Sequence, residues 1–248
     1  MRNIQLDALA FAAHPDDVEL MCAGTIIKLT KMGYKTGVIS LTRGEMGTRG
    51  SAELRRQENA ASAKIMGLSV SEMLDIPDGF VTNTPENRLK VIREIRRYRP
   101  GIIFVPYWEA RNPDHANTSH IVREAAFTAG LKKIDTGQEQ FRPNKVIYYL
   151  ELYEPAPSFI VDVSDAFDDK VRAIQAYGSQ FHNPEQPSDS KDATYISTPG
   201  FLRSIIAKGE YWGNKIGAKY GEPFIVREPV KIDDPVKHFE DYNFAGLQ

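Results

Sequence analysis

Short apolar runs alternate along the chain with longer segments in which apolar residues recur every three or four positions. The apolar runs predict buried strands and span residues 6–13, 36–41, 73–77, 102–105, 146–150, 159–163 and 224–226. The helical patterns span residues 18–32, 52–68, 85–99, 167–177 and 199–216, and one more follows residue 115 and runs to 129. Strands that alternate with helices favour a mostly parallel sheet flanked by helices. We therefore expect an α/β, Rossmann-like fold and a single domain, residues 1–248.

Cap residues and polar segments mark the ends of the predicted elements. Threonine followed by proline, at Thr84 and at Thr198, is typical of a helix start. Threonine caps the first turn, and proline is tolerated in that turn because it needs no backbone N–H there. Residues 179–199 are polar and rich in proline and predict a long loop, and such loops are usually functional or interfacial. Residues 223–248 predict a C-terminal tail, for which packing on another subunit is one open role.

The composition narrows the choice of partner and compartment. The chain is 42% hydrophobic and 26% charged, and its net charge is -2. Because no long basic run is present, we expect neither a nucleic acid nor a membrane as partner. The single cysteine, Cys22, cannot form an intramolecular disulfide and suits a reducing compartment. The N-terminus lacks a signal-peptide pattern and no apolar run approaches the roughly 20 residues that span a bilayer, so we expect a cytoplasmic protein.

The turn after the first predicted strand concentrates groups that can do chemistry. His14, Asp16 and Asp17 stand there within four residues, although buried charge is costly unless it is paired or bound to a metal. A second histidine, His115, follows the predicted strand 102–105. Open α/β sheets place ligands at the carboxyl ends of their strands, so these two loops can meet. We therefore expect His14, Asp17 and His115 to converge.

Two histidines and one carboxylate form the ligand set of a catalytic zinc site that keeps a position open for water. Zinc lowers the pKa of its bound water to about 7 and polarises a carbonyl oxygen. Asp16, which is left over, is then a candidate general base. The alternative is that His-Pro-Asp-Asp only forms a turn and that its histidine is structural, because proline and aspartate are common in turns. Two histidine-bearing loops at one sheet edge favour the metal site.

The segment 42–51 is a candidate binding loop. It contains three glycines and two arginines, Arg43 and Arg49. Glycine lets a backbone approach a ligand closely, and arginine offers forked donors to oxygen; a flexible surface turn is the alternative. In the helix that follows, Arg55 and Glu58 are three positions apart, which on spacing alone favours a surface ion pair.

The motif His-Pro-Asp-Asp at residues 14–17, together with Pro-Asp-His at 113–115, resembles the zinc-dependent N-acetylglucosaminide deacetylases related to PIG-L and LmbE. The resemblance spans most of the chain and is closest to the deacetylase branch of bacillithiol biosynthesis. The supporting stretches are residues 41–50, 179–182, 195–199 and 222–224. The resemblance implies a zinc hydrolase that acts on a small N-acetyl sugar conjugate.

This resemblance also implies a mechanism. His14, Asp17 and His115 match the zinc ligands, and Asp16 matches the base that activates the zinc-bound water. That water attacks the acetamide carbonyl, after which acetate and a free amine leave.

Substrate contacts follow from the same resemblance. Arg55 matches an arginine that grips sugar hydroxyls, and Asp78 matches a sugar-binding carboxylate. A fork of donors and an acceptor suit vicinal hydroxyls. For this branch the substrate would be N-acetylglucosaminyl-malate, whose two malate carboxylates need cationic partners. Arg111, Arg49 and Arg43 are the candidates by position.

One position departs from the family motif, in which His-Pro-Asp-His is usual and Asn-Pro-Asp-His stands here at residues 112–115. The missing histidine is thought to stabilise the tetrahedral oxyanion as an imidazolium oriented by the aspartate, here Asp114. Asparagine donates a hydrogen bond but carries no charge. We expect Asn112 to act as a neutral oxyanion donor, with Asp16 also delivering the proton to the leaving amine.

Several alternatives stay open. His182 or His120 could supply the missing imidazole, or the chain could be a catalytically impaired, zinc-containing sugar-binding homologue. A nucleotide-binding Rossmann protein would carry Gly-x-Gly-x-x-Gly after its first strand, which this chain lacks. Imidazole and carboxylate also suit iron, so Fe2+ is an alternative to Zn2+. The resemblance further implies a homo-oligomer and suggests a hexamer.

Overall fold

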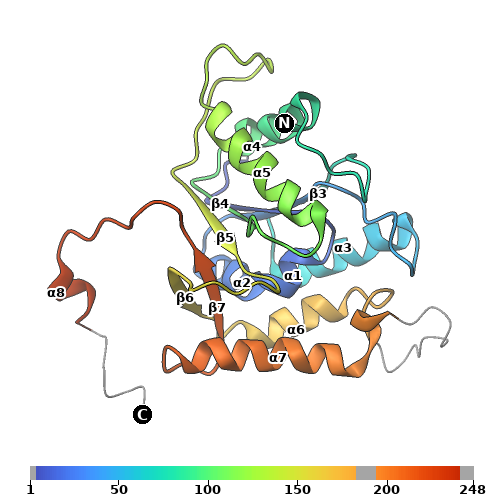
Figure 1. Cartoon of the computed structure of the whole chain (residues 1–248), viewed down its shortest axis with the longest axis vertical. Helices are drawn as coiled ribbons and strands as arrows, with labels where there is room; N and C mark the ends of the chain where they lie inside the picture. The colour runs from blue at the N-terminus through green and yellow to red at the C-terminus, as the bar shows by residue number, and fades with distance from the viewer. Residues whose placement is uncertain (1–3, 183–193, 241–248) are drawn as a thin grey trace.

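One sheet organises the chain. The computed structural model describes residues 4–182 and 194–240. Its strands are β1 (Ala8–Ala12), β2 (Thr36–Ser40), β3 (Val70–Met73), β4 (Ile102–Pro106), β5 (Lys145–Tyr149), β6 (Phe159–Asp162) and β7 (Gly221–Ile225). In the described part they form a seven-stranded sheet in the order β3-β2-β1-β4-β5-β7-β6 (Figure 1). The first five in this order run parallel, whereas β7 is antiparallel to β5 and β6.

Helices cover both faces of the sheet (Figure 1). One face carries α4 (Pro85–Tyr98) and α5 (Pro113–Thr128). On the other side lie α1 (Asp17–Met21), α2 (Ala23–Lys31), α3 (Ala52–Met66), α6 (Phe167–Gln175) and α7 (Pro199–Asn214). The remaining helical pieces are a 3-10 turn at Tyr195–Ser197 and a short helix, α8 (Pro235–His238). The predicted α/β, Rossmann-like fold is confirmed.

The central strand β1 shows how the two layers form. All five of its residues are buried, and their side chains alternate between the two faces. Leu9 and Phe11 belong to the core beneath α4 and α5, whereas Ala8, Ala10 and Ala12 belong to the core beneath α1 and α2. A strand that is apolar on both faces is typical of a parallel sheet with helices on both sides.

The single helix predicted at 18–32 is wrong, because the chain breaks it at Cys22 into α1 and α2. Glu222 of β7 accepts hydrogen bonds from the backbone N–H groups of Gly24 (2.9 Å) and Thr25 (2.7 Å). These groups stand in the first turn of α2, where a helix has no carbonyl of its own to offer them. A carboxylate from the far end of the chain therefore gives α2 a separate start.

The strand predicted at 73–77 lies earlier, at Val70–Met73. Its sequence, Val-Ser-Glu-Met, contains two polar residues among four, which an edge strand with three half-buried residues accommodates. Beyond it, the N–H groups of Leu74 and Ile76 bond to carbonyls at the end of β2, so the apolar residues there continue along the sheet without regular pairing.

Two further boundaries move for local reasons. The strand predicted at 224–226 starts at Gly221, because Glu222 is buried through its ion pair with Lys170 rather than through apolar character. The helix predicted after residue 115 starts at Pro113, because Asn112 caps it.

The predicted loop 179–199 is described only at its two ends, whereas most of the predicted tail is described. Residues 183–193 lie outside the described residues, and the 3-10 turn and the start of α7 occupy the end of the predicted loop. The tail supplies β7 to the sheet, and its described part then leaves the body and carries α8, which stands apart in Figure 1. No helix among the described residues is both long and apolar enough to cross a membrane.

Candidate metal centre and active site

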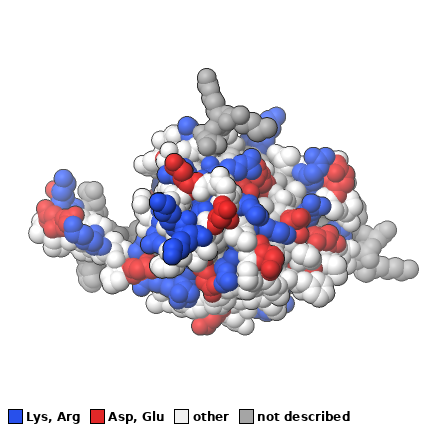
Figure 2. Space-filling model, turned by 90° about the horizontal axis from the view of Figure 1, so that it is seen from above, with Lys and Arg blue, Asp and Glu red and all other residues white. Residues whose placement is uncertain are grey.

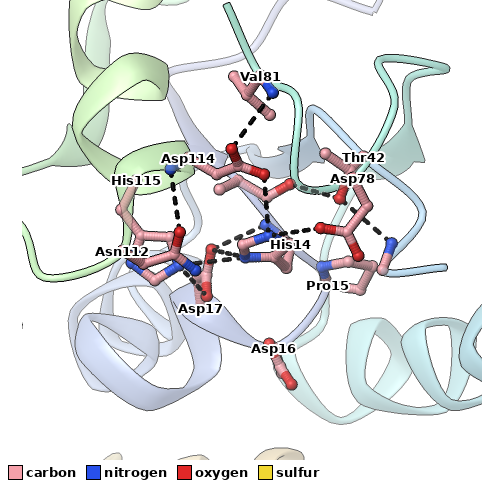
Figure 3. A network of polar contacts seen from close by, with 12 residues as sticks. His14, Pro15, Asp16, Asp17, Thr42, Asp78, Val81, Asn112, Asp114 and His115 are labelled. Carbon is pink, nitrogen blue, oxygen red and sulfur yellow. Dashed lines mark hydrogen bonds and ion pairs between the residues drawn. The ribbon is translucent and has the colours of Figure 1, made fainter. Parts of the chain in front are cut away.

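Polar side chains from several strand ends meet at the carboxyl edge of the sheet (Figure 3). His14 and Asp17 follow β1, Asp78 follows β3, and Asp114 and His115 begin α5 after β4. β1 and β4 are neighbours whose following helices lie on opposite faces of the sheet. The cluster therefore occupies the topological switch point, where open α/β sheets form a crevice for ligands.

The three predicted metal ligands converge. His14 Nδ1 lies 3.1 Å from His115 Nε2 and 3.5 Å from Oδ2 of Asp17, whose Oδ1 lies 3.3 Å from His115 Nε2. A tetrahedral zinc ion with bonds of about 2.0–2.1 Å spaces its ligand atoms about 3.3 Å apart. Two ring nitrogens and a carboxylate that face one another at this spacing fit a shared metal ion, so these residues form the candidate metal site.

The other ring nitrogen of His14 is held by two carboxylates. Nε2 lies 3.0 Å from Asp78 Oδ1 and 3.6 Å from Asp114 Oδ2. Asp78 also accepts the N–H of Met46 at 2.9 Å, and Asp114 accepts two backbone N–H groups of the 79–81 turn. These bonds fix both carboxylates. A proton on Nε2 leaves Nδ1 unprotonated and free to bind a metal.

Glu151 holds the second imidazole in the same manner. Its carboxylate lies 2.6 Å from His115 Nδ1, and the side chain is buried. A proton on Nδ1 leaves Nε2 free toward Asp17 and His14. Glu151 is a functional residue that was not predicted from the sequence. The signal that could have found it is its position just after β5, the strand next to β4, where its carboxylate joins the same sheet edge.

The cluster carries an excess of buried negative charge. Burial alone would lower the pKa of His14, but Asp17 and the two carboxylates at Nε2 outweigh it and raise that pKa to about 12. Burial likewise opposes the effect of Asp17 and Glu151 on His115, whose pKa still rises to about 10. The pKa of Asp17 itself is lowered, because the two histidines outweigh its burial. A proton or a metal cation must therefore offset this charge.

The side chain of Asp16 points away from the metal cluster and toward Arg55. In Figure 3 its carboxylate lies apart from the metal cluster, and its φ of 113° is rare for a residue other than glycine. Arg55 Nη1 donates to the Asp16 carboxylate at 3.0 Å and to the Pro15 carbonyl at 2.9 Å. Burial raises the pKa of Asp16 to about 7, although Arg55 opposes the rise. A carboxylate with such a pKa suits general-base chemistry near neutral pH.

Arg55 and Asp78, the two residues implied as sugar contacts, are both buried and already hold other site residues. The surface ion pair that spacing favoured between Arg55 and Glu58 is wrong. Glu58 is buried and accepts the N–H and the hydroxyl of Ser179, at 2.6 and 2.7 Å. Both side chains face the interior, because the 177–182 segment packs over this side of α3.

The three arginines considered for an anionic group differ in exposure. Arg43 and Arg111 are exposed, whereas Arg49 is half-buried. Nη1 of Arg49 is fully buried and has no hydrogen-bond partner among the described residues. The loop that carries it is held by Gln180, whose side chain donates to the Arg49 carbonyl at 2.7 Å, and by Glu45, which accepts the N–H of Asp78. Arg49 thus offers a buried donor that still needs an acceptor.

Asn112 is the N-cap of α5. Its Oδ1 accepts the N–H of Asp114 at 3.0 Å, so Nδ2 is the free end of the amide and donates to none of the described residues. The Asp114 carboxylate faces His14 rather than residue 112. His120 and His182 form no hydrogen bond or ion pair with the described residues of this site. The structure therefore leaves Asn112 as a neutral donor beside the cluster (Figure 3).

This arrangement suits water activation by a bound metal, which places the chain among metal-dependent hydrolases. The PIG-L family, described as GlcNAc-PI de-N-acetylase, matches residues 9–126, the stretch that contains every predicted metal ligand. A diacetylchitobiose deacetylase of Thermococcus kodakarensis is 32% identical over 86% of this chain and 80% of its own length. The chain belongs to the PIG-L family and is a metal-dependent N-deacetylase of N-acetylglucosamine-type conjugates.

Other relatives show the breadth of the similarity. A 4-oxalmesaconate hydratase of Pseudomonas putida is 28% identical over 73% of this chain and 77% of its own. A Bacillus anthracis protein named as a probable N-acetyl-alpha-D-glucosaminyl L-malate deacetylase 2 is 29% identical over 68% of this chain and 78% of its own. The solved structure of the conserved protein TT1542 from Thermus thermophilus is 38% identical, with a TM-score of 0.84, over 93% of this chain and 98% of that one. The predicted family is confirmed, but these relatives do not single out the bacillithiol branch.

Proposed function

We propose that the chain removes the acetyl group of N-acetylglucosaminyl-malate, the substrate of a bacillithiol-type deacetylase, with Zn2+ as its metal and Fe2+ as the alternative. One observation carries the hydrolytic part: His14, Asp17 and His115 present their ligand atoms 3.1 to 3.5 Å apart, as a tetrahedral ion requires. A relative named as a malate-conjugate deacetylase supports the choice of substrate.

The reaction is a hydrolysis in which a water oxygen bonds to the acetamide carbon and the carbon–nitrogen bond breaks. His14, Asp17 and His115 would hold the metal, which supplies Lewis acidity toward the water and the carbonyl. Asp16, whose carboxylate is bonded to Arg55 and lies apart from the metal cluster in the structure, would have to turn toward the cluster to accept a proton from the water and deliver a proton to the amine as it leaves. A pKa of about 7 lets the same carboxyl group act in both directions near neutral pH.

The developing negative charge on the carbonyl oxygen needs a hydrogen-bond donor. Asn112 Nδ2 fills this role, because Oδ1 is bonded to the helix start and leaves Nδ2 free. Removing one such donor costs on the order of 10² to 10³ in rate. A neutral amide supplies part of the oxyanion stabilisation that the imidazolium of the usual family histidine supplies.

The malate part of the substrate needs cations. Arg49 offers its unpartnered Nη1, and Arg43 and Arg111 are exposed and available. Guanidinium groups bind carboxylates with two parallel donors, so two arginines can satisfy two carboxylates.

The test compares two substrates. We would measure amine release from N-acetylglucosaminyl-malate and from N,N'-diacetylchitobiose by the metal-loaded protein, with Asp16→Ala as the inactive control. We expect kcat/KM to favour the malate conjugate. We also expect Arg49→Gln to raise KM for that conjugate alone, and the matched control Arg56→Gln, at an exposed residue paired with Glu53, to leave both values unchanged. Turnover of diacetylchitobiose alone would discard the malate substrate and keep the deacetylase.

A second candidate is a sugar-binding homologue with impaired catalysis, which Asn112 favours. Converting Asn112 to histidine separates the two. A gain in turnover of 100-fold or more would indicate an impaired site, whereas a loss would show that the site is adapted to asparagine. We also propose a homo-oligomer, as the family resemblance implies.

A further inference from the structure

A groove of about 490 Å³ lies on the body between the end of α5 and the start of β5. This volume falls within the roughly 300–1,000 Å³ that is typical of sites for small molecules. α5 carries His115 in its first turn and the groove residues between 123 and 128 in its last two turns, about 12 to 20 Å further along the helix axis. The groove is therefore separate from the candidate metal centre.

Two arginines that line this groove have no carboxylate of their own. Arg123 of α5 and Arg142, in the loop before β5, are exposed and form no ion pair with any residue that the structure describes. The two glutamates of the lining are already engaged, because Glu124 pairs with Arg88 and Glu228 pairs at 3.0 Å with the lysine that begins β5. The groove thus presents two guanidinium charges that no carboxylate of the described residues offsets by direct contact.

Aromatic rings hold the guanidinium groups in place. Arg142 lies 4.5 Å above the ring of Phe127 and donates to the carbonyl of the same residue at 3.0 Å. Beside the groove, Arg227 lies 4.1 Å above the ring of Trp108 and 5.6 Å above that of Tyr148, which is part of the lining. A guanidinium stacked on a ring keeps its N–H donors at the edge of its plane, where they can still bind an acceptor. The donors are therefore oriented before any ligand arrives.

The surrounding surface favours the same kind of ligand. Figure 2 shows Lys and Arg side chains gathered on the side of the body that faces α8, the side on which Figure 1 places β5. A concave site lined by one sign of charge concentrates ions of the opposite sign. Phe127, which is 58% exposed, adds an apolar wall.

We propose that this groove binds a small organic anion that carries at least two negative charges, as carboxylates or phosphates. The guanidinium fork matches the oxygen pairs of both groups, and two free guanidinium groups suit two such charges. The volume suits a small molecule, and the exposed ring of Phe127 suits an apolar part of that molecule. This ligand is not the substrate, so the inference stands whether or not the malate conjugate is deacetylated.

The first experiment uses two probes of known chemistry on the metal-loaded, full-length protein. Benzene-1,3,5-tricarboxylate supplies carboxylates on an apolar ring, and inorganic phosphate supplies a compact dianion. Isothermal titration calorimetry at low salt should show saturable binding of the first probe, one molecule per chain, with a Kd below about 1 mM that rises as salt is added. Tryptophan fluorescence should change in parallel, because Trp108 contacts Tyr148 of the groove at 4.9 Å.

The two probes and a neutral analogue distinguish the possible ligands. Benzene-1,3,5-trimethanol, which has the same ring without charge, should not bind. Binding of both charged probes would support a general anion site, and tighter binding of phosphate would identify phosphate as the preferred group. If neither charged probe saturates, or if the neutral triol binds as well as the tricarboxylate, the proposal fails.

Substitutions then locate the site. The double variant Arg123→Gln/Arg142→Gln should weaken binding of the tricarboxylate at least about tenfold, because it removes two charge-assisted donors. Arg123→Lys, which keeps the charge and loses the fork, should have an intermediate affinity. The circular dichroism spectrum of each variant checks that it is folded.

Two arginines elsewhere provide matched controls. Arg56→Gln changes an exposed arginine that is paired with Glu53, and Arg49→Gln changes the arginine proposed to bind the substrate. Neither substitution should alter the affinity for the tricarboxylate. Loss of binding in Arg49→Gln, together with full binding in the double variant, would place the anion in the active site and overturn the proposal.

Discussion

At the scale of single residues, the buried pair of Asp16 and Arg55 sets the pH at which the proposed base is ionised. Burial raises the pKa of Asp16 to about 7, and Arg55 acts in the opposite direction. Replacing Arg55 with glutamine removes the cation and so raises that pKa further. We expect the acidic limb of the kcat/KM–pH profile to move to higher pH in Arg55→Gln. Arg56→Gln, whose partner Glu53 is exposed, should keep the original limb, and an unmoved limb in both variants would exclude Asp16 as the base.

Glu151 holds His115, one of the proposed metal ligands, and we expect this contact to raise the metal affinity of the site. It fixes the proton on Nδ1, so Glu151→Gln leaves the ring free to adopt the wrong tautomer or orientation. We expect the affinity for Zn2+ to fall about 10- to 100-fold, measured by competition with a chromophoric chelator. Glu109→Gln, at an exposed carboxylate in the loop before α5, is the matched control. Equal affinities in the two variants would show that Glu151 is only structural.

Asn112 combines two functions that a pair of variants can separate. Asn112→Asp keeps an acceptor for the Asp114 N–H and hence the helix cap, but it replaces the Nδ2 donor with an anion. We expect a loss of kcat of about 10² or more, with the free energy of unfolding nearly unchanged. Asn112→Ala removes the cap as well and should cost about 1 kcal/mol of stability in chemical denaturation. If Asn112→Asp keeps full activity, Nδ2 does not stabilise the oxyanion.

The sequence predicted the residues that form the metal cluster more readily than their partners. His14 and Asp17 come just after the first apolar run, and His115 lies where the helix after the run 102–105 begins, so strand topology brings them to one edge of the sheet. The contact of Glu151 with His115, and that of Asp78 with His14, depend on how loops of different length fold back. No periodicity encodes those distances. The family resemblance likewise identified Arg55 but could not reveal that it pairs with Asp16.

At the scale of elements, long-range polar contacts explain where the predicted boundaries failed. The apolar periodicity predicted the layers correctly, because burial on each face depends on local pattern. It missed the break at Cys22 because Glu222, two hundred positions away along the chain, captures the N–H groups of Gly24 and Thr25. It missed the start of β7 because Glu222 is buried by charge pairing with Lys170.

That pairing makes a prediction about stability. Glu222 and Lys170 are both buried, and their charged atoms are 2.7 Å apart. Glu222→Gln leaves the ammonium group buried without its counter-charge, which costs about 3–5 kcal/mol. We expect a large fall in the free energy of unfolding measured in urea. The double variant Glu222→Gln/Lys170→Met should recover part of the loss; a double variant no more stable than the single one would place the effect in the cap of α2 instead.

At the scale of the whole molecule, the candidate metal site joins segments from both halves of the sheet, so we expect a metal ion bound there to stabilise the fold. A ligand that binds the folded state alone raises the midpoint of thermal unfolding by mass action. We therefore expect a chelator to lower the midpoint, and readdition of Zn2+ to restore it. The variant Asp17→Asn, which lacks one ligand, should show a much smaller difference between the two states.

The size of that difference should depend on pH, and the sign follows from the raised pKa values of His14 and His115, about 12 and about 10. In the metal-free protein, protonated imidazoles stabilise the fold fully below their unfolded pKa of about 6.5, and this contribution is lost as the pH rises toward the raised values.

Metal binding must displace the same protons, so the free energy of metal binding becomes more favourable as the pH rises, by about 1.4 kcal/mol per pH unit for each proton displaced. The gap in unfolding midpoint between metal-loaded and metal-free protein should therefore widen from pH 7 to pH 9 in differential scanning calorimetry. A constant gap would mean that the metal does not replace protons on these two histidines and that it binds elsewhere.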